Sequence, residues 1–212
     1  MSTCCLLVGL VLCSAGPFPS PGPHAVQGVE DFTYSIDLTR VIEDFDGEKC
    51  WFHPRAGILP QGDGAPIVVL TMKRWYVGVS DYFSGLSMVQ SSDLGVTWSA
   101  PVVVDSLAMR LEDERTTVGV CDFTPGWHPA SRKLLGFGHT VRYQDGKLMK
   151  DPRPRETAWS VYDSDTGNWR PWESINMPDM PAFYNSGNGC GQWLVEDSGD
   201  ILVPFYFKEK GS

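Results

Sequence analysis

Residues 91–99 read Ser-Ser-Asp-Leu-Gly-Val-Thr-Trp-Ser, and they contain the motif Ser-x-Asp-x-Gly-x-Thr-Trp. The spaced members of the motif are Ser91, Asp93, Gly95, Thr97 and Trp98. An aspartate that bonds nearby backbone N–H groups, followed two residues later by a glycine that tolerates positive φ, forms a tight turn. Apolar runs at residues 86–89 and 101–104 flank this turn and are typical of strands. The stretch therefore predicts two strands joined by a turn, with the Trp98 ring folded back beneath it.

A related turn follows at residues 163–169, Asp-Ser-Asp-Thr-Gly-Asn-Trp, in which Asp165, Gly167 and Trp169 take the equivalent places. It has an aspartate in place of the leading serine and one residue fewer before the tryptophan. Each turn closes a unit that reads as a strand, a glycine-containing hairpin and further strands. These units are residues 56–104 and 117–172, with a third beginning at 190–207 and an earlier strand at 32–38. A repeated four-stranded unit is typical of a propeller blade.

The motif at residues 91–98 resembles the Asp box, or BNR repeat, of the sialidase (neuraminidase) superfamily. The resemblance covers residues 50–207 and implies an all-β fold, a sialidase-like β-propeller, which has six blades in that family. About the first three blades would fit in this chain, so we expect a partial propeller truncated at its C-terminus. The Asp box is structural in the family and lies away from the active site.

The composition agrees with many short strands separated by turns. The 212 residues include 22 glycines, 16 prolines and eight tryptophans, and 12% are aromatic. The formal net charge is −9, which argues against nucleic acid as a partner, because phosphate binding needs a basic surface. An anionic substrate would need a local arginine cluster.

The N-terminus predicts a secreted protein. Residues 5–14 form an apolar run too short to span a bilayer, and the small residues Ser14-Ala15-Gly16 suit signal-peptidase cleavage. We expect a signal peptide at residues 1–16, a Pro- and Gly-rich linker at 17–30 and the partial propeller at 31–212. The chain would then be extracellular or periplasmic. A mis-assigned start codon followed by an apolar leader is the alternative, because no basic residue precedes the run.

Three of the six cysteines lie in this leader, which leaves Cys50, Cys121 and Cys190. No Cys-x-x-Cys pair is present, so the sequence predicts no structural zinc site. At most one disulfide can form among the three, and buried free thiols fit equally well. We expect neither a metal nor another cofactor.

In a propeller, the connections between blades and the loops between the second and third strands of each blade lie on the same face, which bears the site. Residues in these segments are therefore the candidates for substrate contact. Arg55 begins an inner strand and resembles the first arginine of the sialidase triad, which holds the sugar carboxylate through its planar guanidinium. Asp81 lies in a loop between strands, where the resemblance implies the acid/base aspartate. A surface arginine and an aspartate that caps a turn are the alternatives.

Further substrate-binding candidates follow from the same sorting of faces. They are His53, His139, Arg142, Asp122 and Gln192. Each histidine could bond substrate hydroxyls or act as a base, and a packed structural role is the alternative for each of the five.

The resemblance implies an exo-acting glycoside hydrolase that cleaves a terminal acidic sugar, sialic acid by default, from glycans. The nucleophilic tyrosine, its glutamate partner and the remaining triad arginine of the family would lie C-terminal to residue 212, so we expect this chain alone to be inactive. Two alternatives stay open: another propeller glycosidase or lyase that uses histidine, and a non-catalytic carbohydrate-binding propeller. No membrane span is expected, and the oligomeric state is open.

Overall fold

The computed structural model describes residues 40–79, 81–189 and 191–210. The expected signal peptide, the linker, the strand at residues 32–38 and Cys190 lie outside these residues. The chain divides into residues 1–40 and residues 41–212, and the fold is that of the second unit. Within the described residues, no helix is both long enough and apolar enough for a membrane crossing.

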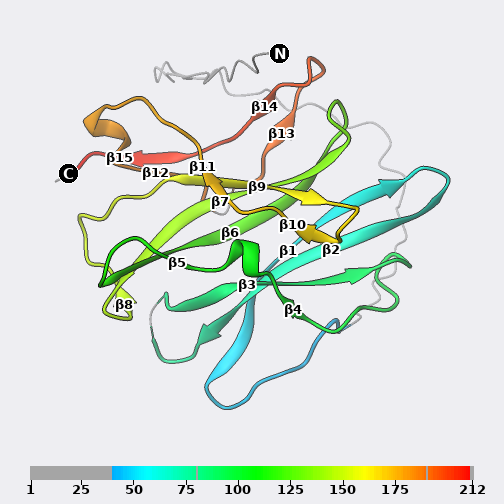
Figure 1. Cartoon of the computed structure of the whole chain (residues 1–212), viewed down its shortest axis with the longest axis horizontal. Coiled ribbons are helices and arrows are strands. Elements are labelled where there is room, and N and C mark those ends of the chain that lie inside the picture. Colours follow the sequence, from blue (N-terminus) through cyan, green and yellow to red (C-terminus); the bar gives the residue numbers. More distant parts are fainter. Residues whose placement is uncertain (1–39, 80, 190, 211–212) are drawn as a thin grey trace, which may run out of the picture. The chain divides into compact units, whose positions relative to one another are not determined.

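The first sheet is an antiparallel meander whose spatial order follows the sequence (Figure 1). Its strands are β1 (Lys49–Gln61), β2 (Gly64–Tyr76), β3 (Phe83–Ser91) and β4 (Val102–Val103). The first strand begins at Lys49 rather than at residue 56, because Cys50 and Trp51 still pair with Trp75 and Arg74 of β2. This sheet contains the predicted hairpin and the predicted turn.

The second sheet repeats the meander and is extended by short edge strands. Its long path is β6 (Thr116–His128), β7 (Lys133–Gln144), β9 (Thr157–Asp163) and β10 (Asn168–Trp169). The short strands are β5 (Arg110–Leu111) beside β6, β8 (Lys147–Leu148) beside β7 and β11 (Glu173–Ser174) beside β9. Residues of β7 are buried on both faces, from Leu134 to Tyr143, so the second sheet has neighbours on either side.

The third region holds two strand pairs. The hairpin of β13 (Leu194–Val195) and β14 (Ile201–Leu202) lies where the sequence predicts one. The strand pairing of β14 does not continue past Pro204, because proline has no N–H to donate to a strand ladder. As a result β15 (Tyr206–Lys208) pairs with β12 (Asn185–Gly187) instead of extending β14.

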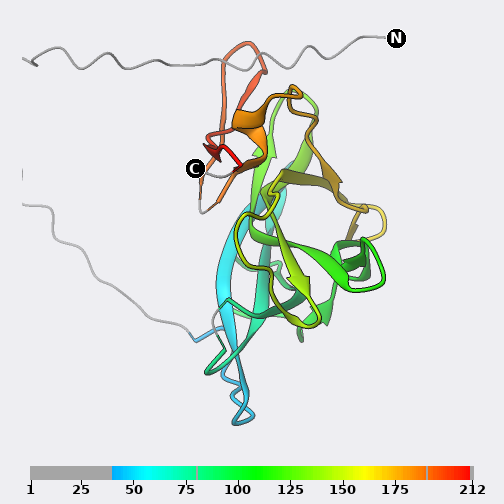
Figure 2. The same ribbon diagram turned by 90° about the vertical axis from the view of Figure 1, so that its left-hand side faces the viewer.

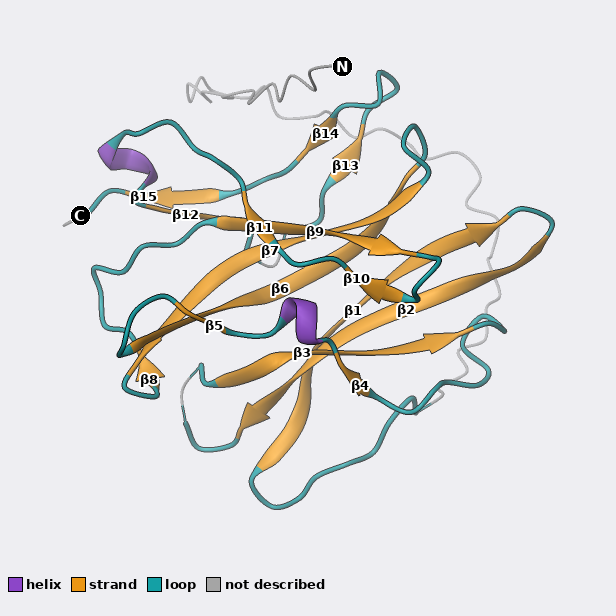
Figure 3. Cartoon of the chain, viewed as in Figure 1, coloured by secondary structure: helices purple, strands orange, loops and turns teal. Residues whose placement is uncertain are grey.

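In the part of the chain that the structure describes, helix is confined to two single turns, η1 (Asp105–Leu107) and η2 (Pro181–Phe183), as Figure 3 shows. The all-β prediction is therefore confirmed.

Apolar cores separate the successive sheets. The largest core lies between the first two sheets and includes Val69 and Leu86 from one and Phe123 and Leu134 from the other. A smaller core between the second sheet and the third region is built on Phe137 and Trp193. Inner strand β1 lies along β6, as Figure 2 shows from the side.

The turn at residues 91–98 has the geometry that its sequence predicts. The hydroxyl of Thr97 donates to Asp93 Oδ2 at 2.6 Å, its N–H donates to Asp93 Oδ1 at 2.9 Å, and Ser91 Oγ donates to Oδ1 at 2.7 Å. Gly95 has a φ of 92°. Trp98 Nε1 donates to the Gly95 carbonyl at 3.0 Å, so the ring lies under the turn.

The second turn uses a different aspartate. Asp163, rather than Asp165, accepts hydrogen bonds from the backbone N–H groups of Asp165 and Thr166. Gly167 again has a positive φ, 66°. Trp169 is buried and meets the ring of Phe123 edge-on at a centroid distance of 4.9 Å, so this tryptophan serves the main core.

We expect Asp93→Asn to destabilise the protein near neutral pH. Hydrogen bonds from the Thr97 side chain, its N–H and Ser91 lower the pKa of Asp93 from 3.8 to about 2. A lowered folded-state pKa adds stability above pH 3.8 that is lost as the pH falls through about 2. In urea unfolding, the difference between wild type and Asp93→Asn should therefore shrink on acidification. Asp165→Asn is the control, and an equal loss of stability in it would contradict this role of Asp93.

We expect Gly57→Ala to loosen the packing of β1 on β6. A Cβ at Gly57 would lie 2.7 Å from Pro125 Cβ and 2.9 Å from the Pro125 carbonyl carbon. Overpacking of this kind costs about 1–3 kcal/mol of unfolding free energy, measurable by urea denaturation. At Gly85 the nearest atom to an added Cβ is 3.4 Å away, so Gly85→Ala should change stability by less than about 0.5 kcal/mol. Equal effects of the two changes would argue against the close approach.

Candidate functional site

The inner strands of the two large sheets share one irregularity. The pairing of β1 with β2 gains an extra residue around His53, and the pairing of β6 with β7 gains one around Asp122. Both residues have a φ of 51°, and Asp81 in the loop before β3 has 49°. A left-handed backbone costs a non-glycine residue about 1–3 kcal/mol and is found most often at functional sites, while a β-bulge redirects side chains. The three residues therefore mark one place as a candidate site.

Side chains of β2 fix the two bulged strands to each other. The Thr71 hydroxyl lies 3.1 Å from the carbonyl oxygen of Phe123 and 3.3 Å from that of Arg55. Lys73 is fully buried, and its Nζ donates to the Val120 carbonyl at 2.6 Å. Because an unbonded buried polar group costs about 1–3 kcal/mol, these contacts hold β6 in a fixed position against the first sheet.

Asp122 is the centre of the site. Its carboxylate Oδ1 lies 3.2 Å from His53 Nδ1 and 3.7 Å from Arg55 Nη2, and its Oδ2 lies 3.6 Å from His139 Nδ1. The aspartate and His139 are buried, whereas His53 and Arg55 keep part of their side chains exposed. The four residues come from β1, β6 and β7, so the bulges bring two sheets to one carboxylate.

A cavity of about 280 Å³ opens onto this carboxylate. Its carboxylate, imidazole and guanidinium side chains are those of His53, Asp81, Asp122, His139, Arg153 and Arg155. Phe83, Val141, Leu148 and Tyr206 provide most of its apolar wall. The cavity therefore presents two carboxylates and two guanidinium groups to a ligand, together with aromatic surface suited to a sugar ring.

Burial keeps both histidines neutral near pH 7. It is the main cause that lowers the pKa of His139 to about 4, and Arg155 adds to the effect while Asp122 opposes it. Burial also lowers the pKa of His53, and the negative charge of Asp122 again opposes this shift. Neutral imidazoles offer one donor and one acceptor nitrogen each, so they can bind hydroxyl groups or a metal ion.

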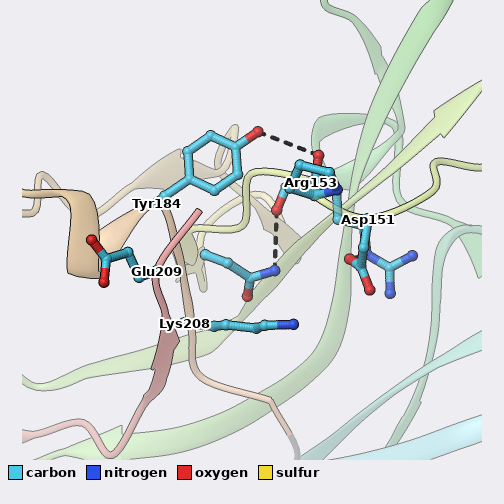
Figure 4. Close-up of a pocket in the computed structure, with 7 residues that line it drawn as sticks. Asp151, Arg153, Tyr184, Lys208 and Glu209 are labelled. Atoms are coloured by element: carbon cyan, nitrogen blue, oxygen red, sulfur yellow. Dashed lines mark hydrogen bonds and ion pairs between the residues drawn. The ribbon is translucent and has the colours of Figure 1, made fainter. Parts of the chain in front are cut away.

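Strand β12 holds the arginine-bearing segment. Asn185 Nδ2 donates to the Arg153 carbonyl at 3.0 Å, as Figure 4 shows in the adjoining cavity of about 190 Å³. The Arg155 backbone accepts from Ser186 N–H at 2.8 Å and donates to the Tyr184 carbonyl at 3.2 Å. These contacts fix the two arginines where the loop after β8 reaches the main cavity.

Arg155 is the arginine best placed to take an anion. Among the described residues no carboxylate lies within 4.0 Å of its guanidinium, which instead lies 5.2 Å from the centre of the Tyr206 ring. Burial and the neighbouring Arg153 lower the pKa of Arg155. Arg153 is partly engaged, since its Nη1 donates to the Met149 carbonyl at 2.8 Å and its Nε lies 3.7 Å from Asp151.

Two sequence candidates lie elsewhere. Arg142 points to the other face of β7 from His139 and Val141, and Glu112 binds it through two contacts of 2.7 and 2.6 Å, with Glu156 at 3.2 Å. Alternation of side chains along a strand puts residues 139 and 142 on opposite faces. Gln192 is exposed before β13 and does not line the cavity.

Sequence reasoning missed Arg153 and Arg155, as well as Cys121 and Tyr206. A signal for the arginines was present, because Arg-Pro-Arg at residues 153–155 lies in the loop between β7 and β9. The rule that selects Asp81, a loop between the second and third strands of a unit, selects this loop too. No sequence signal identifies Cys121, which faces the cavity only through the bulge at Asp122.

One group of donors in the cavity could hold a metal ion. The side-chain atoms of His53, Cys121 and Asp122 lie within 4.8 Å of one another.

Neither a protein-family model nor a curated protein matches the chain. The chemistry of the site is therefore inferred from its residues.

We expect Tyr143→Phe to loosen the segment that carries Asp81. The buried Tyr143 hydroxyl donates to the Asp81 carbonyl at 3.0 Å and accepts from the Phe83 N–H at 3.3 Å. Its removal leaves a buried N–H unbonded, which costs about 1–3 kcal/mol. Urea unfolding and amide exchange at Phe83 measure the effect. Tyr184→Phe, whose hydroxyl makes one exposed 3.4 Å bond, is the control, and unchanged exchange at Phe83 in Tyr143→Phe would refute the expectation.

Proposed function

We propose that this chain carries the substrate site of a sialidase-like β-propeller, an exo-acting glycoside hydrolase that removes a terminal acidic sugar, with sialic acid as the default. Residues 49–103 and 116–169 are on this proposal two consecutive blades, and β12 to β15 belong to a third. The meander order of both large sheets and the tight turn at residues 91–98 are compatible with such a fold.

The observation that carries the proposal is the joint presence of Asp81 and an arginine cluster in one cavity. An acidic sugar needs a cation for its carboxylate, and glycoside hydrolysis needs a carboxylic acid near the leaving oxygen.

The cavity suggests a role for each residue. Arg155 binds the sugar carboxylate. Arg55, for which the sequence predicts this role, does not line the cavity, and it acts through Asp122, which lies 3.7 Å from its Nη2. Asp81 gives a proton to the leaving oxygen and later takes one from water. His53 and His139 bond hydroxyl groups of the ring, and Asp122 fixes both imidazoles by its two oxygens. Phe83 and Tyr206 cover the apolar face of the sugar.

A second candidate is a propeller glycosidase or lyase that uses histidine. It is favoured by the two imidazoles that flank Asp122 and are neutral at pH 7. In this case His139, held by the Asp122 carboxylate, would act as the base that accepts a proton from the substrate, and Asp81 would only bind the substrate. Loss of turnover in His139→Gln together with retention in Asp81→Asn would select this candidate.

The first experiment measures binding of sialic acid to the purified chain by saturation-transfer NMR, and hydrolysis of an aryl sialoside by the full-length product of its gene. We expect Arg155→Ala to weaken binding at least about tenfold, because a charge-assisted pair to the carboxylate is worth roughly 1.5–3 kcal/mol. Asp81→Asn should leave binding unchanged and lower kcat by about 100-fold or more.

Matched controls separate these effects from general damage. Two exposed positions serve as controls: Asp63→Asn in the hairpin between β1 and β2, and Arg170→Ala directly after β10. Both variants should leave both measurements unchanged. Binding without hydrolysis in the full-length protein would favour a carbohydrate-binding propeller. If sialic acid does not bind and sialosides are not cleaved, the proposal is wrong.

A further inference from the structure

We propose that His53, Cys121 and Asp122 form a binding site for Zn²⁺ or a similar transition-metal ion, with an open coordination position that faces the cavity. This inference goes beyond the proposed hydrolase activity, and it departs from the sequence-based expectation of no metal. It rests on the donor geometry of the two bulges and can be tested without turnover.

The donor atoms have separations close to those of a tetrahedral site. Cys121 Sγ lies 3.8 Å from His53 Nδ1, and His53 Nδ1 lies 3.2 Å from Asp122 Oδ1. Zinc bonds of about 2.3 Å to sulfur and 2.0–2.1 Å to nitrogen or oxygen give tetrahedral edges of roughly 3.3–3.6 Å. All three atoms lie within 4.8 Å of one another, so a small rotation of the Cys121 side chain would bring the sulfur to the separation that a tetrahedral site needs.

The chemistry of the donors selects the class of ion. A thiolate and an imidazole favour zinc and similar borderline ions, whereas Ca²⁺ and Mg²⁺ prefer all-oxygen sites. A thiolate and a carboxylate balance the charge of a divalent cation.

His139 provides an independent indication of a ligand. Its Nδ1 is buried without a hydrogen-bond partner among the described residues, and it lies 3.6 Å from the second oxygen of Asp122. Metal-binding carboxylates are oriented by such outer contacts. His139 is therefore a positioning residue that orients the Asp122 carboxylate.

The open position gives the metal a function in the cavity. Three protein ligands plus an exchangeable water are the pattern of zinc sites that take a substrate oxygen. An oxygen of a carboxylate or hydroxyl group in the ligand could replace the water beside Arg155. Metal binding does not depend on the sugar, so its failure and the failure of the hydrolase proposal are distinguishable.

The test titrates the purified, reduced chain with Zn²⁺ by calorimetry and with Co²⁺ by absorption, since a thiolate bound to cobalt gives a sulfur-to-metal charge-transfer band. We expect one ion per chain and a higher Tm with excess Zn²⁺. Cys121→Ala should remove the charge-transfer band, and His53→Ala should weaken binding by at least about tenfold while the band persists at saturating Co²⁺. His139→Ala should weaken binding by about 10–100-fold with the band retained.

Cys50→Ala is the matched control, because Cys50 is a half-buried free thiol of the same strand as His53. It should bind both ions like the wild type. If Cys121→Ala does not fold because Cys121 is buried, His53→Ala still tests the proposal, since His53 is partly exposed. Absence of a charge-transfer band in the wild type, or an unchanged band in Cys121→Ala, overturns the proposal.

Discussion

The contacts that Thr71 and Lys73 make with the carbonyl groups of β6 are the constraint on which the rest of the structure depends. Both side chains belong to β2 of the first sheet, and both are fully buried. They position a strand of the second sheet without any shared backbone ladder. Because a buried lysine and a buried hydroxyl must keep their partners, this junction fixes the spacing of the sheets and thereby the place of Asp122.

The cavity and the tight turn lie at opposite ends of one strand, β3. β3 runs from Phe83, which lines the cavity, to Ser91, which begins the turn. Nine residues of strand span about 25–30 Å. The hydrogen bonds around Asp93 therefore stabilise the end of the sheet far from the site, and three of the left-handed residues, His53, Asp81 and Asp122, lie at the other end.

Asp122 links the two proposals for the cavity. Its carboxylate lies between two imidazoles and near the guanidinium of Arg55. On the first proposal it orients those groups toward a sugar, and on the second it is a ligand of the metal ion together with His53. On both proposals Arg155 is the arginine of the cavity with no described carboxylate within 4.0 Å, so recognition of an acidic ligand does not require the metal. The bulge at Asp122 provides both possibilities because it turns adjacent residues, Cys121 and Asp122, toward one cavity.

The sequence by itself determined the local elements of the described unit. Glycine-containing hairpins, alternating apolar runs and the Asp93–Gly95 pair specify short-range geometry, and the resulting strands and turn agree with the structure. It also singled out Asp81 from its loop between strands, and His53 and Asp122 from their places along the inner strands, because these positions follow from order along the chain. Only the tertiary structure decided that β1 lies on β6 and that Arg155 and Cys121 share their cavity, whereas Arg142 turns away to Glu112. The physical reason is that these placements depend on one-residue bulges and on contacts between residues 47 to 52 positions apart, which no local pattern encodes.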